Sequence, residues 1–157
     1  MMITEEHKSV IPIRPHQAKR VGDGCFYLDM ILFLNGDRIE LGEKVGFNFG
    51  CFINGFGGLS IGDRTLFGPY VMVMTANYNT DNPDALLKEA GFKMLPITIG
   101  RDCCIGMGTQ ICPGVTIGDG VIVGAGSVVC KDLPDWTVCV GNPCKVMRHR
   151  REALCKA

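Results

Sequence analysis

The 157-residue sequence carries little charge, and the charge that it has is balanced. Only 20% of its residues are charged, with 16 lysines and arginines against 16 aspartates and glutamates. A chain without a basic excess has no field that would attract nucleic acid. The balance therefore favours a small-molecule partner over a nucleic acid, and the length is sufficient for one domain with a sizeable core.

Long hydrophobic runs are also lacking. The longest, residues 30–34, is far too short to span a bilayer, and residues 1–20 carry charges where a signal peptide would be apolar. The nine cysteines are an odd count without a CxxC spacing paired with histidine, which argues against a disulfide framework and a zinc site. We expect a reduced, cytoplasmic protein without a membrane span or a metal. Cys103, Cys112 and Cys130 are predicted to be small core or near-core residues.

The sequence does contain a strict six-residue repeat in its C-terminal half. Aliphatic residues occupy every sixth position without a gap: Ile99, Ile105, Ile111, Ile117, Val123 and Val129. Small or branched side chains follow four residues after each of the first five: Cys103, Thr109, Val115, Val121 and Ser127. Repeats of this kind indicate a solenoid, in which one short unit stacks on the next.

A period of six fits neither an α-helix nor an alternating strand. It predicts a short strand and a corner every six residues, so that three units return the chain above itself after eighteen. The resulting all-β fold is a single-stranded parallel β-helix, with coils about 4.8 Å apart. Ile99 would then lie against Ile117, and likewise 105 against 123 and 111 against 129. A glycine-rich β-sandwich with coincidental spacing is the alternative, and six consecutive matches argue against it.

The repeat is rougher in the first half of the chain. One frame comprises Leu41, Phe47, Ile53 and Leu59, and a second, displaced by two residues, comprises Ile61, Phe67 and Val73. The spacing from Val73 to Ile99 is not a multiple of six, so a segment must be inserted between them. Residues 75–96 fit such a loop, with a short helix predicted over residues 83–90. A long loop that leaves a regular solenoid usually has a function.

These patterns predict a single domain, 1–157, with three parts. An N-terminal arm (1–24) precedes a β-helix (25–140) that the loop 75–96 interrupts. A C-terminal cap (141–157) closes the solenoid, and its residues after Val146 are expected to form a short helix, because the ends of a solenoid need covering.

Two segments carry a resemblance to a known family. They read IGDRTLFGPYV, from Ile61, and PITIGRDCCIGMGTQICPGVTIGDGVIVGAGSVVCKDLPDWTVCVGNPCKVMR, from Pro96. This pattern, over about residues 38–148, resembles the maltose and galactoside O-acetyltransferases and the related sugar acetyltransferases of polysaccharide and O-antigen synthesis. The resemblance implies a left-handed β-helix, a homotrimer with active sites between subunits, and transfer of acetyl from acetyl-CoA to a sugar hydroxyl.

A sugar hydroxyl needs a base to remove its proton as it attacks, and donors to hold the oxyanion that develops. In the family the base is a histidine where the loop leaves the coil, and Tyr78 stands at that position here. A phenol, with a pKa of about 10, is a weak base at neutral pH. Asp81 is a second candidate. The three histidines, His7, His16 and His149, lie outside the repeats, and one from the N-terminal arm, His7 or His16, could reach a neighbouring site.

The resemblance also implies the binding residues. Asn48 matches the family's asparagine that faces the acceptor, although it could equally bond its own corner; Asn54 and Asn77 are further substrate-binding candidates. The acidic residues that follow in the sugar enzymes are replaced by Asn54-Gly55-Phe56. The coenzyme candidates are Gly106, Met107, Gly124, Ala125, Cys130, Lys131, Lys145 and Arg148. Trp136 could stack on the adenine or cover the end of the β-helix, and we favour the second of these roles.

Several functions stay open on these residues. The leading one is an acetyl-CoA-dependent O-acetyltransferase that acts on a sugar or a related hydroxyl compound. The replacement at Tyr78 also allows a catalytically silent trimeric protein that binds coenzyme A or sugar, or N-acetyl transfer to an amino sugar. A carbonic anhydrase of the same fold would need three zinc histidines from adjacent coils, and the coils contain none.

Overall fold

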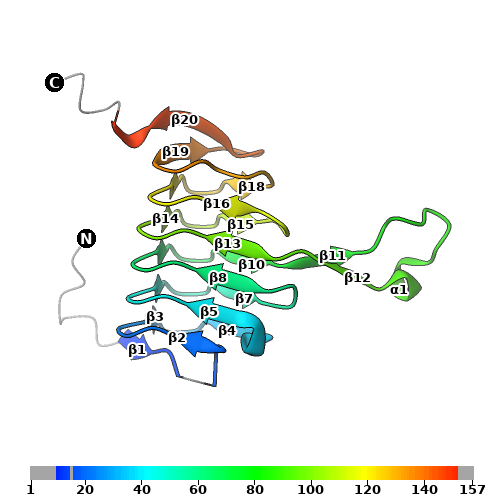
Figure 1. The fold of residues 1–157 in the computed structure, drawn as a ribbon, viewed down its shortest axis with the longest axis horizontal. Coiled ribbons are helices and arrows are strands. Elements are labelled where there is room, and N and C mark those ends of the chain that lie inside the picture. The colour runs from blue at the N-terminus through cyan, green and yellow to red at the C-terminus, as the bar shows by residue number, and fades with distance from the viewer. Residues whose placement is uncertain (1–9, 15, 152–157) are drawn as a thin grey trace.

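The computed structural model describes residues 10–14 and 16–151. Figure 1 shows a stack of coils from which one long arm projects sideways. Three sheets run along the stack, and the strands of successive coils pair in parallel within each of them. Each coil visits the sheets in the order I, II, III. No helix within the described residues is long and apolar enough to cross a membrane.

Sheet I has five strands: β2 (Arg20–Val21), β5 (Ile39–Leu41), β8 (Leu59–Ile61), β13 (Ile97–Ile99) and β16 (Thr116–Ile117). Sheet II has eight: β1 (Val10–Pro12), β3 (Phe26–Leu28), β6 (Gly46–Phe47), β9 (Leu66–Phe67), β14 (Cys104–Ile105), β17 (Ile122–Val123), β19 (Thr137–Val140) and β20 (Lys145–His149). Sheet III has five: β4 (Leu32–Leu34), β7 (Phe52–Asn54), β10 (Met72–Met74), β15 (Gln110–Ile111) and β18 (Val128–Val129).

The six-residue repeat builds these coils as predicted. The pairs Ile99 and Ile117, Ile105 and Val123, and Ile111 and Val129 lie in register on neighbouring parallel strands. All six aliphatic residues are buried, and so are the five small or branched residues between them. The repeat therefore specifies both the stacking and the core, and the β-sandwich alternative is wrong.

The two early frames belong to one continuous stack. Leu59 and Ile61 lie in the same strand, β8, and both are buried. Leu41 pairs with Ile61, and Phe47 with Phe67, so this coil has two residues more than the later ones. The extra residues widen the corner at 55–58, which displaces the frame in the sequence without breaking the stack.

The predicted insertion is the projecting arm in Figure 1. Its two strands, β11 (Ala76–Tyr78) and β12 (Phe92–Met94), pair antiparallel and carry the short helix α1 (Leu87–Ala90) beyond them. Only the last four residues of the helix predicted over 83–90 are helical. Ile61, before the arm, pairs directly with Ile99, after the arm, so the stack closes across the insertion.

The two ends of the solenoid differ from expectation. At the N-terminal end, β2 already pairs in register with β5, and β1 adds to sheet II antiparallel to β3. A 3-10 turn, η1 (Gly36–Arg38), follows the first coil. At the C-terminal end, residues 145–149 form β20, antiparallel to β19, so the predicted helix is wrong for 147–149. Residues 150 and 151 are in a 3-10 helical conformation, and the rest of the predicted helix, 152–157, lies outside the described residues.

Candidate active site

Three corners run along the β-helix, one between each pair of sheets. We name them corner I–II, corner II–III and corner III–I after the sheets they join. The arm leaves at corner III–I, between β10 and β13. The predicted site residues lie on corners II–III and III–I, on the arm and on β20.

The base of the arm is fastened by Thr75, which sequence reasoning did not single out. Thr75 is fully buried. Its hydroxyl donates to the Asn54 carbonyl oxygen at 2.8 Å and accepts from the Gly57 amide at 2.7 Å. Its own carbonyl accepts from the Leu95 amide at 2.9 Å. A Cβ on Gly57 would lie 1.9 Å from that carbonyl oxygen, so only glycine fits where the two arm strands meet the coil.

Tyr78 is part of an aromatic stack on the arm. Its ring lies 5.0 Å from that of Phe92, at an interplanar angle of 28°. Phe92 meets the edge of Phe56 at 5.7 Å, and the Arg38 guanidinium lies 5.6 Å from the Phe56 ring. Tyr78 is 49% exposed, and its hydroxyl makes no hydrogen bond or ion pair with the part of the chain that the structure describes. The geometry presents Tyr78 as a stacking surface rather than as an activated base.

Asp81 and Asn77 are both exposed residues of the arm. The Asp81 carboxylate pairs with the Lys93 ammonium at 3.1 and 3.3 Å, which ties one arm segment to the other. The Asn77 amide oxygen accepts from the Tyr78 amide at 2.9 Å, which leaves its NH₂ group to face solvent or a ligand. Neither residue therefore has a contact that would make it a base.

The other two substrate-binding candidates lie on the coils. Asn48 is on corner II–III, where its side-chain oxygen accepts from the Phe49 amide at 2.8 Å. Asn54, at the end of β7, accepts in the same way from the Phe56 amide at 2.9 Å. Each asparagine therefore fixes its own corner. The Asn48 amide NH₂ makes no hydrogen bond within residues 10–14 and 16–151 and stays available as a donor.

Four coenzyme candidates share corner II–III with Asn48. The strand registers place Asn48, Gly68, Gly106 and Gly124 in one column, one above the other. A Cβ on Gly106 would lie 2.5 Å from the Ala125 nitrogen, so the corner backbones pack too closely for a side chain. Met107 and Ala125 project outward beside the column, and Met107 is 55% exposed. The column offers a narrow strip of main chain against which an extended thiol-bearing arm could lie.

The remaining coenzyme candidates lie elsewhere. Cys130 and Lys131 are exposed on corner III–I, and Cys130 is not the near-core residue that its place in the repeat predicts. Cys103 is buried and Cys112 is half-buried, as expected. Lys145 and Arg148 lie on β20, opposite Val140 and Val138. Within a single chain, the predicted coenzyme residues therefore divide between two corners and the end strand.

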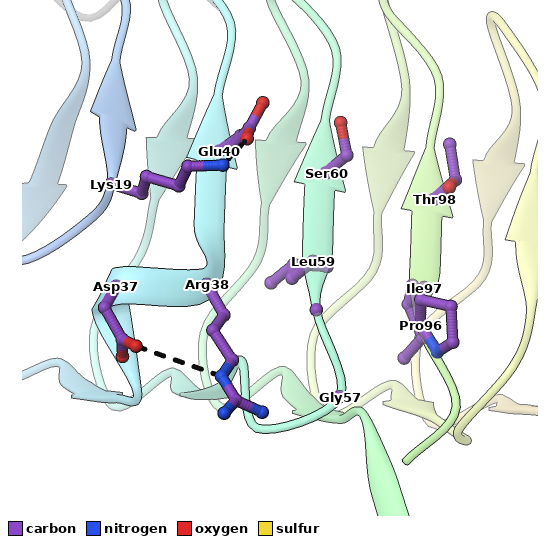
Figure 2. Close-up of a pocket in the computed structure, with 11 residues that line it drawn as sticks. Lys19, Asp37, Arg38, Glu40, Gly57, Leu59, Ser60, Pro96, Ile97 and Thr98 are labelled. Carbon is purple, nitrogen blue, oxygen red and sulfur yellow. Dashed lines mark hydrogen bonds and ion pairs between the residues drawn. The ribbon is translucent and has the colours of Figure 1, made fainter.

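A hollow of about 420 Å³ lies beside the base of the arm, on the outer side of sheet I (Figure 2). Charged side chains frame it: Lys19 pairs with Glu40 at 2.8 Å, and Asp37 approaches Arg38 at 3.8 Å. Arg38 also donates to the Phe56 carbonyl oxygen at 2.7 Å, which connects the hollow to the aromatic stack of the arm. This hollow is not evident from the sequence, because its walls come from four successive coils.

The structure also describes the surroundings of the cysteines and of Trp136. The eight cysteines between residues 10 and 151 are free thiols, and burial raises the pKa of Cys51 to about 11. No group of three or more His, Cys, Asp or Glu side chains in the described ranges is arranged to hold a metal ion. Trp136 packs on Gly120 of the coil below, with the Arg150 guanidinium 5.4 Å from its ring, so it covers the last coil.

Comparisons with known proteins agree with this architecture. Residues 96–131 match the family model described as bacterial transferase hexapeptide (six repeats). The galactoside O-acetyltransferase of Escherichia coli (strain K12) is 36% identical over 129 residues, which are 82% of this chain and 63% of that protein. The chain thus spans less than two thirds of the length of such curated relatives.

Two solved structures are similar over more of their length. A maltose O-acetyltransferase from Clostridium difficile 630 has a TM-score of 0.76 and 35% identity, covering 85% of this chain and 71% of that one. A galactoside acetyltransferase in complex with coenzyme A has a TM-score of 0.77 and 32% identity, covering 88% and 68%. The predicted left-handed winding is confirmed with them. This chain belongs to the hexapeptide-repeat acetyltransferase family.

Proposed function

We propose that this protein transfers acetyl from acetyl-CoA to a hydroxyl of a sugar or a polysaccharide precursor. The observation that carries the proposal is the column of Asn48, Gly68, Gly106 and Gly124 on corner II–III. Asn48 lies two coils, or about 10 Å, from Gly106 along the column. An acceptor held at Asn48 would therefore lie near the reactive end of a coenzyme arm that follows the glycines. The structural relative that holds coenzyme A supports this choice of donor.

The division of the site between two corners supports a homotrimer. Tyr78 and Cys130 belong to corner III–I and its arm, whereas Asn48 and Gly106 belong to corner II–III. A single copy presents these two sets on different edges. If corner III–I of one copy faces corner II–III of the next, the sets form one cleft, and three copies close a ring.

The outer sheet faces fit such an assembly. On sheet III, the outward side chains Leu32, Phe52 and Met72 lie in register and make an apolar row. On sheet I, the matching row is Glu40, Ser60 and Thr98, which is polar. Apolar rows of this kind are typical of surfaces that other chains cover. Sheet III is therefore the face that we expect at the subunit interface, with sheet I toward solvent.

The cytoplasmic location stays a prediction.

The chemistry requires an attacking hydroxyl, a proton acceptor and donors for the oxyanion. The acceptor oxygen attacks the thioester carbonyl, its proton passes to a base, and the thiol of coenzyme A leaves when the tetrahedral intermediate collapses. The stacked Tyr78 is suited to orient the acceptor and to donate a hydrogen bond from its hydroxyl. An amine acceptor would need less help from a base. Because Tyr78 stands where the family has its histidine base, N-acetyl transfer to an amino sugar is the second candidate function.

The proposal is tested by an acetyl-CoA transfer assay with simple sugars and amino sugars. The wild-type chain is compared with Tyr78→His and Tyr78→Phe. We expect the wild type to acetylate a sugar and Tyr78→His to raise kcat, because imidazole is the better base near neutral pH. A silent wild type with an active Tyr78→His variant would instead establish the non-catalytic binding protein. A wild type that turns over while Tyr78→Phe does not would give the phenol hydroxyl a direct role in the reaction.

The homotrimer is tested by light scattering. Leu32→Glu and Met72→Glu place charge on the apolar row of sheet III, and Ser60→Glu places it on the polar row of sheet I. We expect the two sheet III variants to dissociate the assembly and Ser60→Glu to leave it intact. The reverse pattern would place the interface on sheet I and contradict the proposed cleft.

A further inference from the structure

Two cysteines lie one above the other at corner III–I. Ile111 and Val129 pair in register on parallel strands, and Cys112 and Cys130 follow them directly. The Cys112 amide donates to the Val129 carbonyl oxygen at 2.9 Å, so the register continues through both cysteines. Neighbours in such a register are separated by about 4.8 Å between Cα atoms, within the range that a disulfide can bridge.

The two thiols differ in exposure in a way that suits exchange chemistry. Cys130 is exposed, so a small molecule can reach it, whereas Cys112 is half-buried beside it. Burial raises the pKa of the Cys112 thiol, and the neighbouring Cys130 raises it further. Cys112 therefore stays protonated at neutral pH, while the exposed Cys130 is the thiol that meets a reagent first.

We propose that Cys112 and Cys130 form a reversible thiol–disulfide pair at corner III–I, which in the proposed trimer faces the coenzyme column of the next copy, and that a low-molecular-weight disulfide oxidises this pair. The Cys130 thiolate attacks the reagent, forms a mixed disulfide and releases one thiol. Cys112 then loses its proton and attacks the Cys130 sulfur, which forms the link between the two coils and releases the second thiol. The two cysteines are oxidised by two electrons, and the reagent is reduced to two thiols.

We expect this link to be easily reversed. Neighbouring strands of a sheet lie about 4.8 Å apart, which is more than the Cβ separation of about 3.8 Å that a relaxed disulfide prefers, so we expect the link to be strained. A strained disulfide is reduced more readily than a relaxed one, which is typical of switches and not of structural bridges. Closing it also removes the exposed Cys130 thiol from the corner that, in the proposed trimer, faces the coenzyme column of the next copy.

Other thiols in the neighbourhood are less suitable partners. Cys144 also lies near Cys130, but at 7% exposed it is more deeply buried than Cys112, and it lies in a turn and not on a strand paired with β18. Cys104 is exposed like Cys130, but its neighbours in register on sheet II are Leu66 and Ile122. Cys104 is therefore the matched control: an accessible thiol without a cysteine above or below it.

The test is to treat the full chain with glutathione disulfide and then count thiols after denaturation. We expect the count to fall from the nine cysteines of the sequence to seven, with a Cys112–Cys130 peptide in the digest and full recovery with dithiothreitol. Cys130→Ser and Cys112→Ser should each abolish the link, whereas Cys104→Ser should form it as the wild type does. A stable glutathione adduct on Cys130 without the link, or a link to Cys144 instead, would overturn the proposal.

A second arm separates this inference from the proposed function, on which its link to the coenzyme rests. Acetyl-CoA, which has no free thiol, is added during oxidation. Slower formation of the link supports both the thiol pair and the coenzyme site at this edge. An unchanged rate of formation leaves the pair supported and contradicts the placement of the coenzyme beside Cys130.

Discussion

The coils that follow the insertion and the arm that forms it are stabilised in different ways. In the coils, every aliphatic residue of the repeat is buried, and each lies against its counterpart in the coils above and below. In the arm, large apolar side chains face outward: Leu86 is 59% exposed, Leu87 57% and Phe92 56%. The coils therefore supply their own core, whereas the arm depends on two short strands and the Thr75 anchor.

This difference indicates where the family's common chemistry and this chain's own specificity lie. The core side chains of the coils can vary little, because each of them packs against its counterparts in the coils above and below. The arm contacts the coils mainly at its base, so its side chains can change with little effect on folding. The replacement of the expected histidine by Tyr78, and the stack of Tyr78 on Phe92, both lie in this tolerant region. If the two regions are independent, a substitution in the coils should affect stability and a substitution in the arm should affect substrate binding.

The largest effect on stability is expected for a substitution in the coils. Ile105 is fully buried between Phe67 and Val123, so Ile105→Ala should lower the free energy of unfolding by about 2–5 kcal/mol. Leu87→Ala in the arm should change it by less than about 0.5 kcal/mol, because Leu87 is exposed. Urea unfolding of both variants measures the contrast. Similar losses for the two would show that the arm is packed into a core, for example against another copy.

Alkaline pH should also destabilise the coils and not the arm, which contains no cysteine. Burial raises the pKa of Cys51 from 9.0 to about 11, so the folded state keeps a proton that the unfolded state loses first. Stability from this thiol is fully present below about pH 9 and is lost as the pH rises through 11, by about 2–3 kcal/mol. The free energy of unfolding is measured in reductant at about pH 8 and about pH 10.5.

Two variants test whether Cys51 causes this alkaline sensitivity: Cys51→Ser, and Cys104→Ser as a matched control at an exposed thiol. Cys51→Ser removes the titrating group while keeping a donor for the Gly68 carbonyl that the Cys51 thiol contacts at 3.3 Å. It should show a smaller decrease between the two pH values than the wild type. Cys104→Ser should show the same decrease as the wild type. An identical decrease in Cys51→Ser would attribute the alkaline sensitivity to other groups.

A smaller effect is expected for the aromatic stack of the arm. Phe92→Ala removes the ring on which Tyr78 lies, and such ring contacts contribute about 0.5–1.5 kcal/mol. We expect a higher KM for the acceptor, an unchanged KM for acetyl-CoA and a melting temperature lowered by no more than about 4 °C. Leu86→Ala, farther along the arm, serves as the control. A lower kcat with an unchanged acceptor KM would mean that the stack acts in the chemical step.

The same division explains how much of the molecule the sequence predicts. The coils follow from the spacing alone, because six residues per strand and corner leave a single way to stack Ile99 on Ile117. The insertion was also predictable, since the stack has to close across it. The family resemblance, carried by these segments, is confirmed.

What the sequence does not predict depends on contacts between distant segments. Residues 147–149 suit a helix by composition, but the free edge of β19 offers backbone partners, and pairing with it makes them a strand. The hollow next to Arg38 and the anchor at Thr75 each combine residues from separate coils. Their side chains are ordinary threonine, glycine and arginine, which carry no signal until the register between coils is known.

The smallest effect distinguishes two ion pairs of similar chemistry. Arg64, in the coil before the arm, binds Asp102, in the coil after it, through two hydrogen bonds of 2.7 and 2.9 Å. Arg64 lowers the pKa of the Asp102 carboxyl, so this stability is present above about pH 4 and is lost as the pH falls through the lowered pKa. Both partners are partly exposed, so Asp102→Asn should cost no more than about 1 kcal/mol, and less in high salt.

Asp81→Asn breaks the more exposed pair with Lys93 in the arm and should cost nothing measurable. Urea unfolding near neutral pH and near pH 3 tests both variants, because the difference between wild type and Asp102→Asn should vanish in acid. Equal losses for the two variants would mean that the Arg64 pair does no more to hold the coils together across the insertion than the Lys93 pair does within the arm.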